Sequence, residues 1–277
     1  MTPASSSPRH ARLIELFSAI QGEGLNVGTR QLFIRFATCD LRCWFCDSAR
    51  TWRSPETCQI EKTPGGRDFE SHPNPVGGDD LLAWIERQNV PGLHDSISLT
   101  GGEPLLHSPF LAGILPEIKR LTGLPIYLET GGHRPAQLAA IASDLDLVGM
   151  DIKLPSVSGE THWEEHGRSL QLCRDAHLPV FVKVIISDRT DARELERTAQ
   201  LVAEIDPEIE VFLQPVTLLG KEERARLETE WAIAKQPLRA IVSPPCPDRV
   251  LAWQGLMKRT LKRVRVVPQT HKMLGQL

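Results

Sequence analysis

The chain has 277 residues, with 32 Lys and Arg against 35 Asp and Glu, which gives a formal net charge of −3. This balance provides no strong positive field, so we expect no nucleic-acid partner. The sequence has no run of about 18 apolar residues, which a membrane span needs, and no apolar secretory segment near its start. We therefore expect a cytoplasmic protein with a disordered tail at 1–11 and a single domain at 12–277.

Short β-branched runs alternate with amphipathic segments along the chain. The pattern predicts strands at 31–36, 96–99, 126–129, 147–150, 179–186, 210–214 and 264–267. It predicts helices at 79–88, 109–121, 135–142, 162–176, 192–205, 221–235 and 248–262. Alternation of this kind indicates βα units and a mostly parallel sheet. Because no Rossmann glycine fingerprint is present, an α/β barrel or an open, partial β/α barrel is favoured over a doubly wound sheet.

Residues 53–78 interrupt this rhythm. They hold eight Gly or Pro in 26 positions and show no clean period. We interpret them as a long insertion in the domain. Long connections in compact domains are usually functional or mobile.

Polar or glycine-rich residues follow most of the predicted strands. Thr100-Gly101-Gly102-Glu103-Pro104 follows 96–99, and Thr130-Gly131-Gly132 follows 126–129. Asp151-Ile152-Lys153, Gln214-Pro215 and the run from Gln269 to Lys272 come after later strands. The carboxyl ends of parallel barrel strands lie at one end of the barrel, where active sites form. The sequence therefore predicts one shared site.

Three of the six cysteines, Cys39, Cys43 and Cys46, share one loop with the spacing C-x3-C-x2-C. Three thiolates can hold three irons of a 4Fe–4S cluster and leave the fourth iron open. A zinc site would need a fourth ligand, for which Cys58 or His72 are candidates. The other cysteines are single and far apart, so no second cluster is expected.

The segment Cys39-Asp40-Leu41-Arg42-Cys43-Trp44-Phe45-Cys46, together with the GGEP of 101–104, resembles the radical S-adenosylmethionine (SAM) enzymes. The resemblance implies that the open iron binds SAM and that the reduced cluster cleaves it to an adenosyl radical. It also implies a set of SAM-binding residues: Phe45, Gly101, Gly102, Glu103, Thr130, Lys153 and Gln214. Simple loop packing remains an alternative for Phe45, and Lys153 and Gln214 could line the substrate pocket instead.

Four further motifs narrow the resemblance: QGEG at 21–24, CDS at 46–48, ETGG at 129–132 and QTHKMLG at 269–275. Together they resemble the 7-carboxy-7-deazaguanine synthase family. That family implies a carbon–nitrogen lyase that converts 6-carboxy-5,6,7,8-tetrahydropterin to 7-carboxy-7-deazaguanine and ammonia, in queuosine and 7-deazapurine biosynthesis. It further implies Mg²⁺, a flavodoxin or ferredoxin as electron donor, and a homodimer. The alternatives are a radical SAM enzyme acting on another heterocycle and a non-catalytic zinc module.

The chemistry of a carboxylated pterin matches several residues. Arg35 faces away from Leu32, Ile34 and Phe36 on its strand, so it either meets a substrate carboxylate inside the barrel or forms a salt bridge there. The pterin edge carries two adjacent N–H donors, for which Glu23 and Glu129 are candidate acceptors; Glu23 could instead be a capping or surface residue. The full predicted substrate set is Ile20, Gln21, Gly22, Glu23, Arg35, Glu129, His271 and Leu277.

Two positions depart from the family pattern. Ser48 stands where the family usually has Thr, the implied magnesium ligand, and it keeps the hydroxyl oxygen that this hard cation prefers. Gly131 stands where many relatives have Asn, so any contact from that side chain is absent. Lys272 is expected to be solvated.

Overall fold

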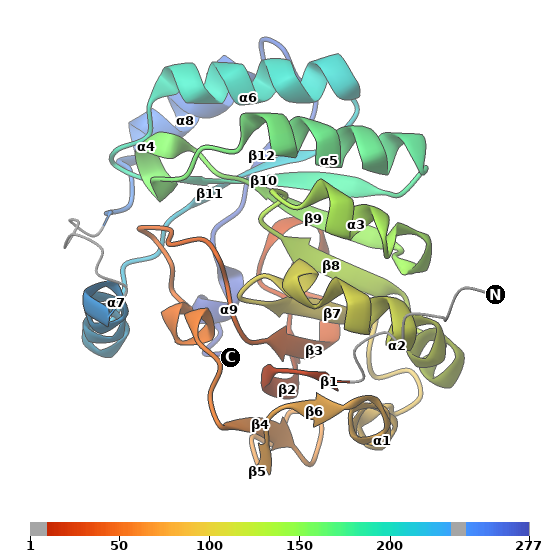
Figure 1. Cartoon of the computed structure of the whole chain (residues 1–277). Helices are drawn as coiled ribbons and strands as arrows, with labels where there is room; N and C mark the ends of the chain where they lie inside the picture. Colours follow the sequence, from red (N-terminus) through yellow and green to blue (C-terminus); the bar gives the residue numbers. More distant parts are fainter. Residues whose placement is uncertain (1–9, 234–241, 277) are drawn as a thin grey trace.

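The computed structural model describes residues 10–233 and 242–276. Within these ranges, ten strands pair in the order β12-β11-β10-β9-β8-β7-β3-β2-β4-β5, and β1 pairs with β6 (Figure 1). The seven strands from β12 to β3 are mutually parallel, β2 is antiparallel to β3, and β5 is antiparallel to β4. The expected α/β fold with a mostly parallel, open sheet is confirmed. Within the described ranges, no helix is long and apolar enough to span a membrane.

The strands are β1 (His10–Ala11), β2 (Leu13–Ile20), β3 (Arg30–Phe36), β4 (Thr57–Glu61), β5 (Phe69–Pro73), β6 (Val76–Gly77), β7 (Ser96–Gly101), β8 (Ile126–Thr130), β9 (Leu147–Ile152), β10 (Val180–Ile186), β11 (Val211–Pro215) and β12 (Val264–Val266). The helices are α1 (Gly78–Gln88), α2 (Ser108–Thr122), α3 (Pro135–Ala139), α4 (Pro155–Ser158), α5 (Trp163–Asp175), α6 (Ala192–Ile205), α7 (Lys221–Ile233), α8 (Pro247–Met257) and α9 (Thr270–Met273), with 3-10 turns η1 (Gly24–Asn26), η2 (Ala49–Trp52), η3 (Pro104–His107) and η4 (Ala142–Asp144).

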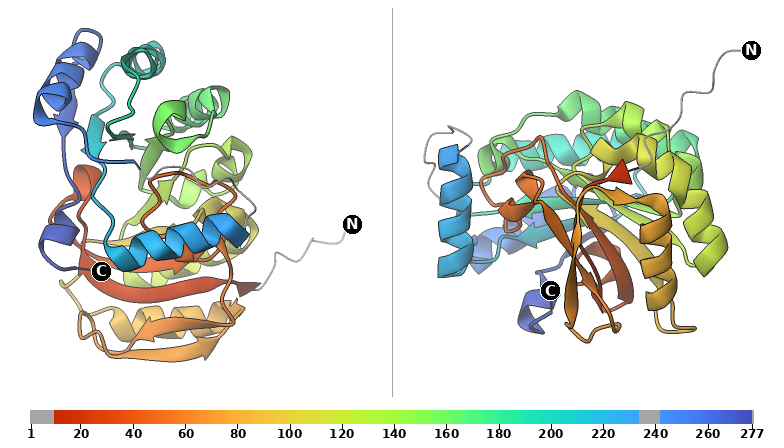
Figure 2. Two further views of the ribbon diagram at one scale, coloured as in Figure 1. Left: turned by 90° about the vertical axis from the view of Figure 1, so that its left-hand side faces the viewer. Right: turned by 60° about the horizontal axis from the view of Figure 1, so that its bottom comes forward.

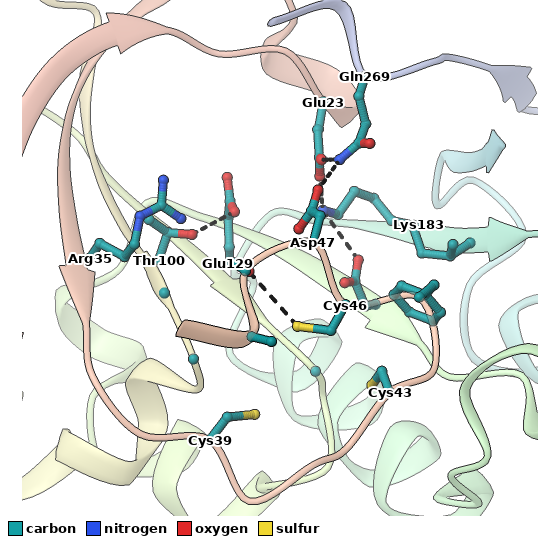
Figure 3. A pocket seen from close by; sticks show the side chains of 18 of the residues that line it. Glu23, Arg35, Cys39, Cys43, Cys46, Asp47, Thr100, Glu129, Lys183 and Gln269 are labelled. Carbon is teal, nitrogen blue, oxygen red and sulfur yellow. Dashed lines mark hydrogen bonds and ion pairs between the residues drawn. The ribbon is translucent and has the colours of Figure 1, made fainter. Parts of the chain in front are cut away.

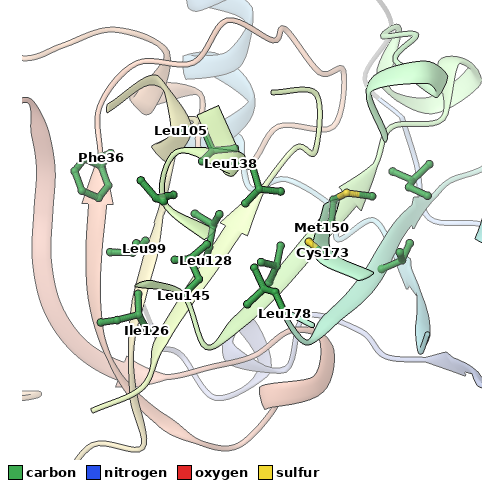
Figure 4. Close-up of a cluster of buried hydrophobic side chains, with 14 of the residues drawn as sticks. Phe36, Leu99, Leu105, Ile126, Leu128, Leu138, Leu145, Met150, Cys173 and Leu178 are labelled. Atoms are coloured by element: carbon green, nitrogen blue, oxygen red, sulfur yellow. The ribbon is translucent and has the colours of Figure 1, made fainter. Parts of the chain in front are cut away.

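The outer face of the sheet is apolar and is covered by helices. Alternate residues of the parallel strands, such as Phe36, Leu99, Leu128 and Met150, pack against α2, α3 and α5 (Figure 4). Cys173 of α5 is fully buried in this layer, as expected for a structural cysteine. Figure 2 shows α7 apart from the covering helices, lying across the open side of the sheet.

The inner face has two levels. At the amino ends of the strands, the rings of Tyr127, Phe181 and Phe212 pack together. Gly149 makes room for them, because a Cβ there would lie 2.4 Å from the Tyr127 hydroxyl and 2.7 Å from the Phe181 ring. Polar side chains occupy the carboxyl ends of the same strands. The fold therefore closes one end of the barrel with aromatic rings and leaves a polar mouth at the other.

Most predicted elements lie within two residues of the observed ones, but several differ. Helix α8 ends at Met257 rather than at 262, and the predicted helix 135–142 divides into α3 and η4. Of the tail predicted at 1–11, His10 and Ala11 form β1, while residues 1–9 lie outside the described ranges. Residues 234 and 235 of the predicted helix 221–235 also lie outside them.

Strand β2 was missed because its sequence, LIELFSAI, is buried on both sides and shows little alternation. The 53–78 insertion is also more regular than predicted. It forms the hairpin β4–β5 and the short strand β6, and β4 extends the sheet by pairing with β2. Pairing of backbone groups along the sheet edge explains how a Gly- and Pro-rich segment is ordered.

Buried Glu61 holds this hairpin in place. Its carboxylate accepts hydrogen bonds from the backbone N–H groups of Ser18 (2.9 Å), Gly65 (3.0 Å) and Arg67 (2.8 Å). One carboxylate therefore joins β2 to the turn between β4 and β5.

We predict that Glu61→Gln lowers the free energy of unfolding by about 1–3 kcal/mol, because an amide group cannot accept all three bonds and would bury an unpaired donor. Limited proteolysis should also cut faster within 62–68. Chemical denaturation measures the first effect, with the exposed Glu56→Gln as matched control. Equal unfolding midpoints for the two variants would contradict this role.

Candidate active site

A single cavity of about 610 Å³ opens at the polar mouth of the sheet. Its volume suits small organic ligands. Every predicted site residue in the described chain lines it. These residues are Ile20, Gln21, Gly22, Glu23, Arg35, Cys39, Cys43, Phe45, Cys46, Ser48, Gly101, Gly102, Glu103, Glu129, Thr130, Lys153, Gln214 and His271. Leu277 lies outside the described ranges.

The loop after β3 brings Cys39, Cys43 and Cys46 around a common space (Figure 3). All three are free thiols, and burial raises the pKa of each to about 12. The apo site therefore holds neutral thiols at pH 7, and metal binding must displace their protons. Three converging cysteines on one short loop fit a cluster held by three thiolates.

The proposed fourth zinc ligands lie elsewhere. Cys58 of β4 and His72 of β5 face each other across the edge hairpin, with the Cys58 thiol 3.6 Å from the His72 carbonyl oxygen. Neither lines the cavity. Within the described ranges, no three His, Cys, Asp or Glu side chains are placed to hold a single metal ion.

The glycines of the TGGEP turn are required by the chain's own packing. A Cβ on Gly101 would lie 2.2 Å from the Phe36 carbonyl oxygen, and one on Gly102 would lie 1.9 Å from that of Thr38. Gly101 also has a φ of 128°, which L side chains rarely adopt. The turn therefore lies directly against the start of the cysteine loop.

Glu103 fixes this turn to the next one. Its carboxylate accepts hydrogen bonds from the Thr130 hydroxyl (2.9 Å) and the backbone N–H groups of Leu105 (3.1 Å) and Gly131 (2.9 Å).

Phe45 both packs against the core and lines the cavity, and the Lys153 ammonium lies 5.3 Å from its ring centroid. The carbonyl oxygen of the buried Gln214 side chain has no hydrogen-bond partner in the described chain, so it is free to bind a ligand.

Arg35 forms the salt bridge that was one of its two predicted roles, and its contact with a substrate carboxylate stays a prediction. It lies on the inner face and lines the cavity, and its Nε also donates to Glu15 at 2.6 Å. The same Glu15 oxygen accepts from Arg50 at 2.5 Å. Within the described chain this ion pair uses only Nε, so the terminal nitrogens of Arg35 remain available to a ligand.

The two candidate acceptors for the pterin edge have opposite electrostatics. Burial alone would raise the pKa of Glu23, but the charge and hydrogen bond of the Lys183 ammonium, 2.5 Å away, together with the hydrogen bond from Gln269, lower that pKa. Burial and the nearby Glu23 charge raise the pKa of Glu129. Glu129 accepts hydrogen bonds from Gln21 (2.7 Å) and Thr100 (2.9 Å). Glu23 caps no backbone group with its side chain, so the capping interpretation is wrong.

The carboxy-terminal segment forms one wall of the cavity. His271 lies in α9 rather than at the end of a strand, and a Cβ on Gly22 would lie 2.2 Å from its Nδ1. Gln269 donates to both Glu23 (2.7 Å) and Asp47 (2.9 Å). Lys272 was expected to be solvated, but its Nζ lies 2.9 Å from Asp47 and it lines the cavity.

Five further residues line the cavity without a role having been predicted for them. Thr100, Asp151 and Gln269 were expected at the strand ends of the shared site and Asp47 lay within the CDS motif, whereas Lys183 was missed. Lys183 had a usable signal, because a lone charge between Val182 and Val184 in a strand faces opposite to its apolar neighbours. Asp151 and Gln269 lay inside motifs, but their partners could not be identified without the fold.

The chain matches the radical SAM superfamily over residues 33–202. It is 39% identical to the 7-carboxy-7-deazaguanine synthase of Geobacter sulfurreducens over 96% of this chain and 98% of the relative. It is 31% identical to that of Methanothermobacter thermautotrophicus, covering 96% and 97%. The chain belongs to the 7-carboxy-7-deazaguanine synthase family of radical SAM enzymes.

Solved structures show the same fold. The crystal structure of QueE from Escherichia coli matches with a TM-score of 0.50 at 20% identity, covering 82% of this chain and 92% of that one. SuiB from Streptococcus suis matches with a TM-score of 0.54 at 11% identity, covering 84% and 47%. The expected partial barrel of the radical SAM type is thus confirmed, and family membership implies a 4Fe–4S cluster and SAM.

We predict that Ala in place of any one of Cys39, Cys43 or Cys46 abolishes cluster binding after anaerobic reconstitution, because three thiolates are needed. Iron and sulfide analysis with visible absorbance measures this. Cys58→Ala and Cys246→Ala should bind the cluster normally, since neither thiol lines the cavity. A colourless Cys58→Ala protein would instead support the four-ligand zinc site.

Proposed function

We propose that this chain converts 6-carboxy-5,6,7,8-tetrahydropterin to 7-carboxy-7-deazaguanine with release of ammonia, for queuosine and other 7-deazapurines. The observation that carries the proposal is the single cavity that joins the cysteine loop to a cation and two carboxylates suited to this substrate. Identity of 39% along nearly the whole chain to a relative of this name supports it.

Cys39, Cys43 and Cys46 would hold the cluster, and the strand-end residues Gly101, Gly102, Thr130, Lys153 and Gln214 would surround SAM. Cluster and SAM together supply the hydrogen abstraction that starts the reaction. The residues of this half of the cavity would hold SAM and the cluster in the geometry that the reaction needs, and such positioning can account for a large part of a rate enhancement.

On the substrate side, Arg35 would bind the pterin carboxylate through its terminal nitrogens while Glu15 holds its Nε. Glu23, kept ionised by Lys183, would accept the two adjacent N–H groups of the pterin edge. The pKa of Glu129 is raised and that of Glu23 is lowered, so Glu129 takes up a proton more readily than Glu23. Burial lowers the pKa of His271, so its imidazole is neutral and can donate or accept beside the ligand.

The deciding experiment is anaerobic turnover of reconstituted protein with SAM, a reductant and the carboxylated pterin. We expect the deazaguanine product and ammonia in equal amounts. Product formed only from another heterocycle would overturn the proposal.

We also propose that the protein acts as a cytoplasmic homodimer reduced by a flavodoxin or ferredoxin, which sedimentation and reduction by those donors would test.

Magnesium is part of the proposal. Ser48 lines the cavity, and its hydroxyl lies 4.0 Å from the Cys46 sulfur. A hydroxyl is an oxygen ligand of the kind Mg²⁺ prefers, and substrate and water oxygens would complete its shell. The neighbouring Asp47 carboxylate is engaged by Gln269 and Lys272.

We predict that Ser48→Ala raises the magnesium concentration needed for half-maximal turnover and lowers kcat, with SAM affinity unchanged, because it removes one oxygen ligand and no thiolate. Ser48→Thr should behave like the parent protein. Magnesium titrations of the three proteins measure this. Superimposable curves for the Ala and parent proteins would exclude a ligand role.

We predict that Lys183→Met raises the KM for the pterin at least about tenfold, because removing one partner of a buried ion pair leaves a carboxylate unpaired. Without the ammonium, the pKa of Glu23 rises, so Glu23 becomes protonated as the pH falls and accepts fewer bonds. The KM of the variant should therefore increase further at lower pH. Steady-state kinetics over pH measures it, with Lys183→Arg as control, and a pH-independent KM would contradict the role.

A further inference from the structure

Gly131 leaves a space that another side chain of the same turn fills. A Cβ at position 131 would lie 2.9 Å from Nδ1 of His133, 3.2 Å from Leu41 and 3.3 Å from Glu103. The φ of Gly131 is not positive, so the backbone would accept an L side chain. Space, and not conformation, therefore restricts this position.

His133 connects two parts of the site. Its Nε2 lies 3.0 and 3.1 Å from the two carboxylate oxygens of Asp40, the residue after Cys39. Its Nδ1 lies 3.7 Å from Glu103 and has no hydrogen-bond partner in the described chain. The side chain is only 5% exposed. The buried imidazole of His133 thus lies between the cysteine loop and Glu103, whose carboxylate joins the turns after β7 and β8.

The hydrogen bonds of Glu103 and Asp40 show what the contact between His133 and Asp40 connects. Glu103 already joins the turn after β7 to the turn after β8 through Thr130 and Gly131. Asp40 adds a side-chain link from the cysteine loop to the segment after β8, through His133 and Arg134. Of these two contacts, only that of His133 also fills the space at position 131.

We propose that His133 is a positioning residue for SAM: it occupies the space that Gly131 leaves and holds the cysteine loop, through Asp40, against the turn after β8 that carries Thr130. This deepens the SAM-binding half of the proposed function and rests on it. It does not depend on which heterocycle is the substrate.

The test measures SAM binding to the reconstituted protein by equilibrium dialysis, without pterin and without reductant, so that failure of the proposed substrate would not affect the result. His133→Ala should weaken SAM binding about tenfold, as outer-shell partners of metal sites commonly do. It should also speed iron loss to a chelator and leave the KM for the pterin unchanged. If the Ala variant does not fold, His133→Asn, which is too short to bridge to Asp40, replaces it.

Gly131→Ala provides the sharper readout, because its effect should depend on residue 133. In the parent protein the added methyl group displaces the imidazole and should weaken SAM binding. In the His133→Ala background the same methyl group enters the vacated space, so the double variant should bind SAM more tightly than His133→Ala alone. This reversal of sign is expected only if the two positions share one space.

Two controls separate the possible causes. Arg134→Ala removes the other partner of Asp40 without touching the space at 131, and should change SAM affinity by no more than roughly twofold. Gly255→Ala adds a methyl group where no atom lies within 4 Å and should have no effect. The proposal is overturned if Gly131→Ala acts equally in both backgrounds, or if His133→Ala lowers only the melting temperature.

Discussion

The buried ammonium of Lys183 is the charge around which the cavity is arranged. It lies 2.5 Å from Glu23 and 3.3 Å from Asp151, and its side chain is 5% exposed. An isolated ion at this depth would be costly, so it is tolerated only with both carboxylates in place. Burial alone would lower the pKa of Lys183, but Asp151 and Glu23 raise it well above its usual value. The ammonium thus remains charged, and it keeps Glu23 charged as well.

From this centre, polar and charged side chains form a continuous series of contacts across the mouth of the sheet. On one side Asp151 also binds Lys153, which lies over Phe45 of the cysteine loop. On the other side the chain of contacts runs through Glu23, Gln269 and Asp47 to Lys272. The substrate side and the SAM side are therefore parts of one network. A change in one charge should be felt at both, because the low dielectric of the interior strengthens each contact.

Much of this site could be predicted from the sequence. The βα rhythm predicted which strand ends meet, the alternation of one strand placed Arg35 on the inner face, and the motifs supplied Glu129 and the three cysteines. Pairing partners could not be predicted, because they depend on strand order and on side-chain reach. The lone charge of Lys183 in an apolar run was a usable signal, but its partners Glu23 and Asp151 were not visible, and Lys272 was interpreted as solvated. The edge hairpin was missed for a related reason. Its order depends on pairing with β2 and on the buried Glu61, neither of which leaves a local pattern.

The wall formed by residues 269–276 has a consequence for how the protein acquires its site during folding. Gln269 bonds Glu23 across 246 positions of the chain, and Arg67 of the edge hairpin binds the Gly275 carbonyl oxygen. Contacts this distant in sequence form late, since the intervening chain must first be ordered. The sheet can form before residues 269–276 pack against it, but Glu23 and Asp47 gain Gln269 and Lys272 as partners only when that segment docks. During folding, the cysteines therefore lie in an unfinished pocket until this wall is in place.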